Sequence, residues 1–227
     1  MYRPDLFENF WDMNKEYFAW ILTKYKIQGH VAGVAVAILH KYGMGGSVRE
    51  LRNMFCLVAC YEQNKKRLDF CCGKGSDVRV ADPVRHLATV FWKEMTEEFC
   101  VYPEMPLERI VTLVEVTGRG ENQFLFHILV SGFSAASITK ELQLRTQVPG
   151  LPSCYTEMSY CVHVPMDSSG VLMPHDPSLR MTDYAAQYGK TFIKVLDLHW
   201  GDHIFSAQKM FRPATIRHYD SARGVAY

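Results

Sequence analysis

The chain has 227 residues, of which 48% are hydrophobic and 22% are charged. This size and composition suit one compact globular domain, with or without arms. The net charge is +1, so no strong overall field points to nucleic acid, a membrane or an acidic substrate as a partner.

The cysteines do not form a recognisable motif. No two of them have the CxxC spacing that is usual for zinc sites and thioredoxin-like redox sites. We therefore expect buried or idle thiols in a reducing compartment. No apolar segment follows a basic N-terminus, which predicts that there is no signal peptide. The longest apolar run, residues 31–39, is too short to span a bilayer.

The first predicted element is an aromatic-rich helix over residues 5–26. The spacing of Phe7, Phe10 and Trp11 fits one helical face, and Pro4 before Asp5 is a plausible start signal. We expect this segment to lie on the main body as a helix or an arm.

A small, apolar, glycine-rich segment follows over residues 28–46. Its glycines at 43, 45 and 46 lack the GxxxxGK[ST] pattern, so they indicate a flexible turn rather than a phosphate loop.

The next region mixes strand and helix signals. Ser47 and Glu50 have the spacing of a capping box. Residues 55–61 could be a buried strand or a buried helix, because periodicity does not decide so short an apolar run. Residues 67–72 are predicted as a strand.

Asp82 then starts an amphipathic helix that ends before Pro103. Its apolar face holds Val84, Leu87, Ala88, Phe91, Trp92 and Met95.

From residue 108 onward the pattern favours strands. Residues 109–117 and 123–130 predict a hairpin around a polar turn. Residues 137–147 and 156–164 are predicted as two further strands. The total of seven or eight strands with two or three helices favours an antiparallel sandwich or an α+β fold.

The C-terminal stretch, residues 188–219, is predicted as two strands. The first covers residues 191–198, and a polar turn with Gly201 and Asp202 follows it. The second covers residues 210–219 and contains Pro213, which is tolerated in a strand only at a sheet edge or a bulge.

Two groups of side chains could carry chemistry. His199 and His203 lie four residues apart beside acidic residues, which on a helix would suit a metal. The segment also fits a strand and a turn, which favours solvated loop histidines.

A nucleophile and base could come from Cys154 or Cys161 with His163 or His175. Cys161 and His163 share a face of the predicted strand. Such a pair is more often a buried thiol beside a hydrogen-bonded histidine than a catalytic pair.

Seven short segments follow one another in a particular order. They are residues 8–10, 51–55, 68–70, 122–132, 159–168, 188–195 and 211–219. In that order they resemble parts of the jelly-roll coat protein that surrounds the fivefold axes of picornaviruses. Residues 8–10 resemble the segment before its first strand, residues 159–168 resemble a segment ahead of a long loop, and the others resemble strands. The chain departs from that family because it lacks the long internal arm and the proline-rich C-terminal exit. The helix after Asp82 would be an insertion.

The resemblance implies a structural coat protein that assembles with other capsid subunits into an icosahedral shell around RNA. It implies a mainly β jelly roll with an aromatic arm and Gly-rich segment (residues 1–46), a core (residues 47–219) and a tail (residues 220–227). The RNA genome and a host receptor are further candidate partners. The protein would be found in the virion and the host cytoplasm.

The same resemblance implies no catalytic residue, cofactor or metal. A hydrophobic pocket would be lined by Phe124, Phe126, Ile128, Tyr160 and Val162. Assembly contacts would come from Phe7, Phe10, Trp11, Arg212, Arg217 and Tyr219. The alternative is an intracellular α+β enzyme or adaptor with a Cys/His or His/His site.

Overall fold

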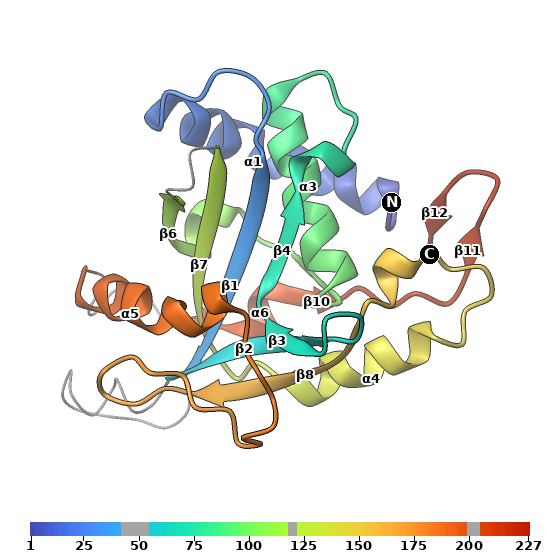
Figure 1. The fold of residues 1–227 in the computed structure, drawn as a ribbon. Helices are drawn as coiled ribbons and strands as arrows, with labels where there is room; N and C mark the ends of the chain where they lie inside the picture. The colour runs from blue at the N-terminus through green and yellow to red at the C-terminus, as the bar shows by residue number, and fades with distance from the viewer. Residues whose placement is uncertain (42–54, 118–121, 199–204) are drawn as a thin grey trace.

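A computed structural model describes residues 1–41, 55–117, 122–198 and 205–227 of the chain (Figure 1). It is a mixed α/β structure with about 31% strand and 36% helix, built on a large sheet that is not a closed barrel. Helices and strands occur together as expected, but helix exceeds strand, so the structure is mixed rather than mainly β, and the antiparallel sandwich or jelly roll is not confirmed.

The large sheet is organised around β1 (Gly33–Lys41). β1 runs parallel to β7 (Gln123–Ser131) over its whole length, from the pair Gly33–Gln123 to the pair Lys41–Ser131. Its other edge pairs antiparallel with β2 (Phe55–Glu62) and with β4 (Cys71–Lys74). The seven residues from Gly33 to Leu39 are all buried, as expected for a strand covered on both faces.

Further strands extend the sheet on either side. β3 (Arg67–Asp69) and β8 (Met158–Pro165) pair with β2, and β6 (Val111–Val116) pairs antiparallel with β7. β9 (Phe205–Ser206) adds a short parallel pairing to β7. The predicted hairpin and the predicted strands near residues 67–72 and 156–164 are therefore confirmed. For residues 55–61, where the sequence left a buried strand or a buried helix open, the structure shows a strand.

Two helices cover one face of the sheet, α1 (Pro4–Lys24) and α3 (Pro83–Glu97) (Figure 1). The sequence predicted α3, and it left a helix or an arm open for the segment that forms α1. The Asp82 side chain caps α3 by accepting a hydrogen bond from the Val84 amide at 3.1 Å. Phe10 of α1 stacks on Phe91 of α3, and Phe91 meets Phe126 of β7 edge to face. These aromatic contacts join both helices to the sheet in one apolar core.

The structure corrects the predicted strand at residues 137–147, which form helix α4 (Ala135–Arg145). The Ser134 side chain caps this helix by accepting from the Ser137 amide at 3.1 Å. Ile138, Leu142 and Arg145 are buried at helical spacing. α4 packs on β8, the outer strand of the sheet.

The structure also corrects the predicted strand at residues 191–198, which belong to helix α5 (Asp183–Leu198). The Thr182 hydroxyl accepts from the Ala185 amide at 3.1 Å where the helix starts. Ala185, Tyr188 and Phe192 face a second apolar core on the sheet face opposite α1 and α3. Inside it the Tyr188 hydroxyl lies 2.6 Å from His127 Nδ1, and the other ring nitrogen lies 3.0 Å from Glu115.

The remaining elements lie at the edges of the molecule. β5 (Val101–Pro103) pairs with β10 (Phe211–Pro213), so Pro213 does lie in a two-stranded edge pairing. The predicted strand over residues 210–219 is nevertheless wrong in its extent, because β10 ends at Pro213 and residues 214–218 form no strand. β11 (Tyr219–Asp220) and β12 (Val225–Ala226) form a hairpin beside the N-terminus (Figure 1). Short helices complete the chain: η1 (Gly75–Asp77), η2 (Leu107–Arg109), η3 (Ser153–Tyr155) and α6 (Ala207–Met210).

Several expectations lie outside the described residues. They concern the capping box of Ser47 and Glu50, the glycines at 43, 45 and 46, the turn with Gly201 and Asp202, and the pair His199 and His203. Within the parts of the chain that the structure describes, no helix is long and apolar enough to cross a membrane.

Candidate functional site

Three glutamates gather at the C-terminal end of α3. Glu94, Glu97 and Glu98 are 8%, 7% and 8% exposed. Their i, i+3, i+4 spacing places them on neighbouring positions of one helix side. The negative end of the helix dipole lies at the same place, so backbone and side chains repel one another there. Three buried carboxylates in this position need a compensating partner.

Strand β4 brings a thiol to these carboxylates. The ligand atoms of Cys71, Glu94 and Glu98 all lie within 4.8 Å of one another. The Cys72 amide donates a hydrogen bond to Glu98 Oε2 at 2.9 Å. The Glu94 carboxylate, by contrast, has no hydrogen-bond or ion-pair partner among the described residues. Glu94 is therefore both nine-tenths buried and unpaired.

A glycine allows this close approach of strand and helix. A Cβ built on Gly73 would lie 1.7 Å from Glu94 Oε1, so any side chain at this position would displace the carboxylate. Gly73 thus leaves room on β4 for the carboxylate of a neighbouring helix.

Burial dominates the ionisation of the cluster. It raises the pKa of Glu94 to about 8, and the nearby Glu97 adds to the effect. Burial also raises the pKa of Glu97, and burial and Glu94 raise that of Glu98 well above its usual range. Burial raises the pKa of the Cys71 thiol as well. Without a cation the site therefore favours bound protons, which a divalent cation would displace.

The cluster borders a cleft of about 420 Å³. Glu94, Glu97 and Glu98 line it, together with Gly73 of β4. Its other charged lining residues are Glu62, Asp69, Asp77, Glu157, Lys65, Lys74 and Lys93. The acidic cluster is thus accessible from a cavity large enough for a small molecule.

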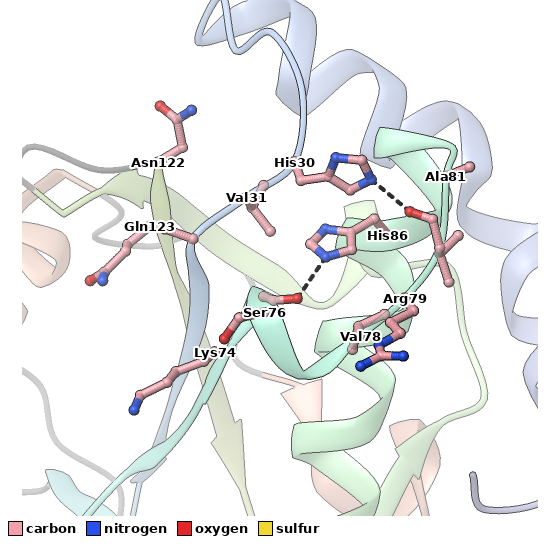
Figure 2. Close-up of a pocket in the computed structure, with 13 residues that line it drawn as sticks. His30, Val31, Lys74, Ser76, Val78, Arg79, Ala81, His86, Asn122 and Gln123 are labelled. Carbon is pink, nitrogen blue, oxygen red and sulfur yellow. Dashed lines mark hydrogen bonds between the residues drawn. The ribbon is translucent and has the colours of Figure 1, made fainter.

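A second pocket of about 970 Å³ adjoins the first and shares Ala32, Lys74 and Gln123 with it. Its other basic lining residues are His30, Arg79 and His86, and no acidic residue is among the residues that line it. Figure 2 shows the side chains of Lys74 and Gln123 extending to the same side, away from the two imidazoles. The two neighbouring pockets therefore differ in charge.

The two histidines of this second pocket hold the surrounding backbone. His30 Nε2 lies 2.6 Å from the Val80 carbonyl oxygen, and His86 Nε2 lies 2.8 Å from that of Gly75 (Figure 2). The rings meet edge to face at 4.5 Å. His86 Nδ1 is buried without a hydrogen-bond partner in the described structure.

Arg145 of α4 fixes the end of α3. Its guanidinium is fully buried and donates hydrogen bonds to the carbonyl oxygens of Thr96, Glu97 and Ala214 at 2.7, 2.8 and 2.6 Å. A cation bound to the last carbonyls of a helix opposes the negative end of its dipole. Arg145 therefore stabilises the turn that carries the glutamates.

The residues predicted to line a hydrophobic pocket lie in two places. Phe124, Phe126 and Ile128 are fully buried in the core under α1 and α3. Val162 packs against the other core, and Tyr160 stacks on a neighbouring tyrosine of β2. The structure brings the first three together but not all five.

The residues predicted as assembly contacts are also divided. Phe7 and Phe10 are 2% and 1% exposed, inside the core of this chain. Arg212 and Arg217 are exposed and form ion pairs with Glu104 at 2.6 Å and Glu141 at 3.4 Å. Trp11 and Tyr219 are half-buried.

The candidate thiol–imidazole pairs do not form a joined site. Cys161 is buried opposite Cys60 of β2, and no hydrogen bond links it to His163. His163 stacks on His40 at 4.7 Å, and burial lowers its pKa. Cys154 is half-buried in the acidic cleft, and His175 is exposed on a loop. A free thiol near an acid is held protonated, which disfavours a nucleophilic role.

The glutamates of α3 were not predicted as site residues, although the sequence carries a signal for them. Leu87, Phe91, Glu94 and Glu98 follow one another at i, i+4, i+7 and i+11. Two acidic residues therefore continue the buried stripe of the amphipathic helix, where apolar residues are expected. Acidic residues near a helix C-terminus are also unfavourable.

Comparisons with protein-family models, with curated proteins and with solved structures found no significant match.

Proposed function

We propose that this chain is a divalent-cation-dependent hydrolase that cleaves a phosphate ester or phosphate anhydride. The unpaired, buried Glu94 carboxylate beside Glu98 carries the proposal. Such a group is costly in a folded protein unless it is protonated or binds a cation. The site is also reached from a cleft, as a catalytic cation requires.

The side chains around the cleft suit hydrolysis. Glu94 and Glu98 would hold a cation whose bound water becomes acidic enough to attack at neutral pH. Glu97 has a raised pKa and lines the same cleft, so it could accept the proton of that water. Lys93 would stabilise negative charge that develops in the transition state.

The charge of the two pockets supports a phosphate-bearing substrate. A phosphate group would approach the cation and Lys74, and the remainder of an anionic substrate would extend towards Arg79 in the neighbouring basic pocket. Divalent cations are commonly bound by a few carboxylates together with substrate phosphates.

The test is phosphate release by the purified chain from pyrophosphate, nucleotides and sugar phosphates, with Mg²⁺, Mn²⁺, Co²⁺ or Zn²⁺. We expect turnover that requires a cation and that falls about 100-fold or more in Glu94→Gln and Glu98→Gln. Glu108→Gln, which changes an exposed carboxylate, should retain activity. Failure of the wild-type chain to bind any divalent cation would overturn the proposal, as would full activity in Glu94→Gln.

The coat-protein function implied by the sequence resemblance, with its jelly roll, stays a prediction. Light scattering of the chain expressed with its neighbouring gene products would test it. Regular particles or pentamer-sized species would favour a shell, and a monomer under every condition would count against it. The hydrolase belongs instead to the enzyme class considered as the alternative, with carboxylates in place of a Cys/His site.

A further inference from the structure

We infer that the cation of this site is a thiophilic ion such as Zn²⁺ or Co²⁺, held by the sulfur of Cys71 together with Glu94 and Glu98. The inference rests on the proposed cation site and specifies which cation occupies it. It differs from a purely carboxylate site, which would favour Mg²⁺ or Mn²⁺.

The positions of the ligand atoms support three protein ligands. One sulfur and two carboxylate oxygens lie within 4.8 Å of one another. Zinc binds sulfur at about 2.3 Å and carboxylate oxygen at about 2.0 Å, so tetrahedral ligands lie roughly 3.5 Å apart. A small closure of the two glutamate side chains brings the atoms to that spacing. The fourth position would face the cleft that Glu94 and Glu98 line, and catalytic zinc sites keep such a position for water or substrate.

The thiol is rigidly placed. Cys71 is fully buried and lies opposite Val36 in the antiparallel pairing of β4 with β1. The following residue, Cys72, has an exposed side chain and is not part of the ligand cluster, although its amide holds Glu98. Successive strand residues point to opposite faces, so only Cys71 directs its sulfur at both carboxylates.

The unpaired Glu94 carboxylate indicates that the cluster binds a cation. Glu94 is 8% exposed, lines the cleft and has no hydrogen-bond or ion-pair partner among the described residues. A site that only stabilised the fold would be expected to pair this carboxylate, as Glu98 is paired. A bound cation would satisfy Glu94 and would take the thiolate of Cys71 in exchange for its proton.

Cobalt spectroscopy of the whole chain under reducing conditions tests the inference without measuring activity. Titration with Co²⁺ should produce a near-ultraviolet thiolate-to-cobalt charge-transfer band and visible bands of a four-coordinate ion. Cys71→Ser should abolish the charge-transfer band and lower Zn²⁺ affinity about 100-fold while it changes Mg²⁺ affinity little. The matched variant Cys72→Ser should leave the spectrum unchanged.

The outcomes separate this inference from the proposed function. A wild-type spectrum without the charge-transfer band would overturn it, as would loss of the band in Cys72→Ser or tighter binding of Mg²⁺ than of Zn²⁺. If the cobalt spectrum contradicts a thiolate ligand but Glu94→Gln still abolishes cation binding, the proposed cation site is retained and only the role of Cys71 is rejected. If the wild-type chain binds no divalent cation, both proposals fail. Unchanged circular dichroism of Cys71→Ser would show that any loss is not due to misfolding.

Discussion

Replacement of Glu94 by glutamine should make the cation-free protein more stable at neutral and alkaline pH. The pKa of Glu94 is raised from 4.5 to about 8 in the folded chain. Between these values the folded state binds a proton that the unfolded state has released, so stability is greatest at low pH and falls as pH rises. One such proton gives a slope of about 1.4 kcal/mol per pH unit, which is about 2 kcal/mol between about pH 6 and about pH 7.5. Glutamine keeps the shape of the side chain and removes the titration.

The assay is urea unfolding of the chelator-treated protein at a series of pH values. The difference in unfolding free energy between Glu94→Gln and wild type should grow in favour of the variant as pH rises through this range. Glu108→Gln should follow the wild-type curve, because Glu108 is exposed. Saturating Zn²⁺ should reverse the order, since a ligand of the folded state stabilises it and the variant has lost a ligand. A difference independent of pH would refute the reasoning, because the carboxylate would then be ionised and stabilised within the fold.

Three further predictions concern the surroundings of the site. Arg145→Ala should destabilise the chain by about 3 kcal/mol in urea unfolding, because three buried carbonyl oxygens lose their donor; a loss under about 1 kcal/mol would contradict this. Gly73→Ala should leave the fold intact but weaken Zn²⁺ binding about tenfold or more, because the new methyl group displaces the Glu94 carboxylate. Calorimetry measures the affinity, and an unchanged value would argue against the proposed ligand position. Tyr188→Phe should cost about 1–2 kcal/mol of stability, because it leaves His127 Nδ1 unpaired in the core, and no measurable change would show that water replaces the hydroxyl.

The sequence predicted the element that carries the site better than the site itself. Asp82 before Pro83 and the apolar stripe of α3 follow local rules of capping and periodicity, and the helix forms where they indicate. The ligand cluster depends on β4 lying beside the end of that helix. Cys71 and Glu94 are far apart along the chain, and their contact follows from the pairing of β4 with β1, which one sequence does not specify.

Helices α4 and α5 were predicted as strands for a shared reason. Their sequences contain β-branched and aromatic residues that favour strands, such as Ile138 and Thr139 in α4 and Phe192 and Ile193 in α5. The helical spacing of the buried residues decides the structure, since each helix packs one apolar side on the sheet. The parallel pairing of β1 with β7 was also missed, because it joins distant segments and leaves no hairpin signal.

Three structural features reduce the cost of placing carboxylates at the negative end of a helix. Gly73 provides the room, the Cys72 amide holds Glu98, and Arg145 opposes the dipole through the carbonyl oxygens beside Glu97. All three leave Glu94 without a hydrogen bond or ion pair among the described residues, and the nearby positive charge of Lys93 offsets only part of the effect of its burial. A cluster that served only stability would be improved by replacing Glu94 with an apolar residue. The Glu94 carboxylate instead lies at the edge of a cleft, which favours a site where folding stability is lower so that a cation can bind.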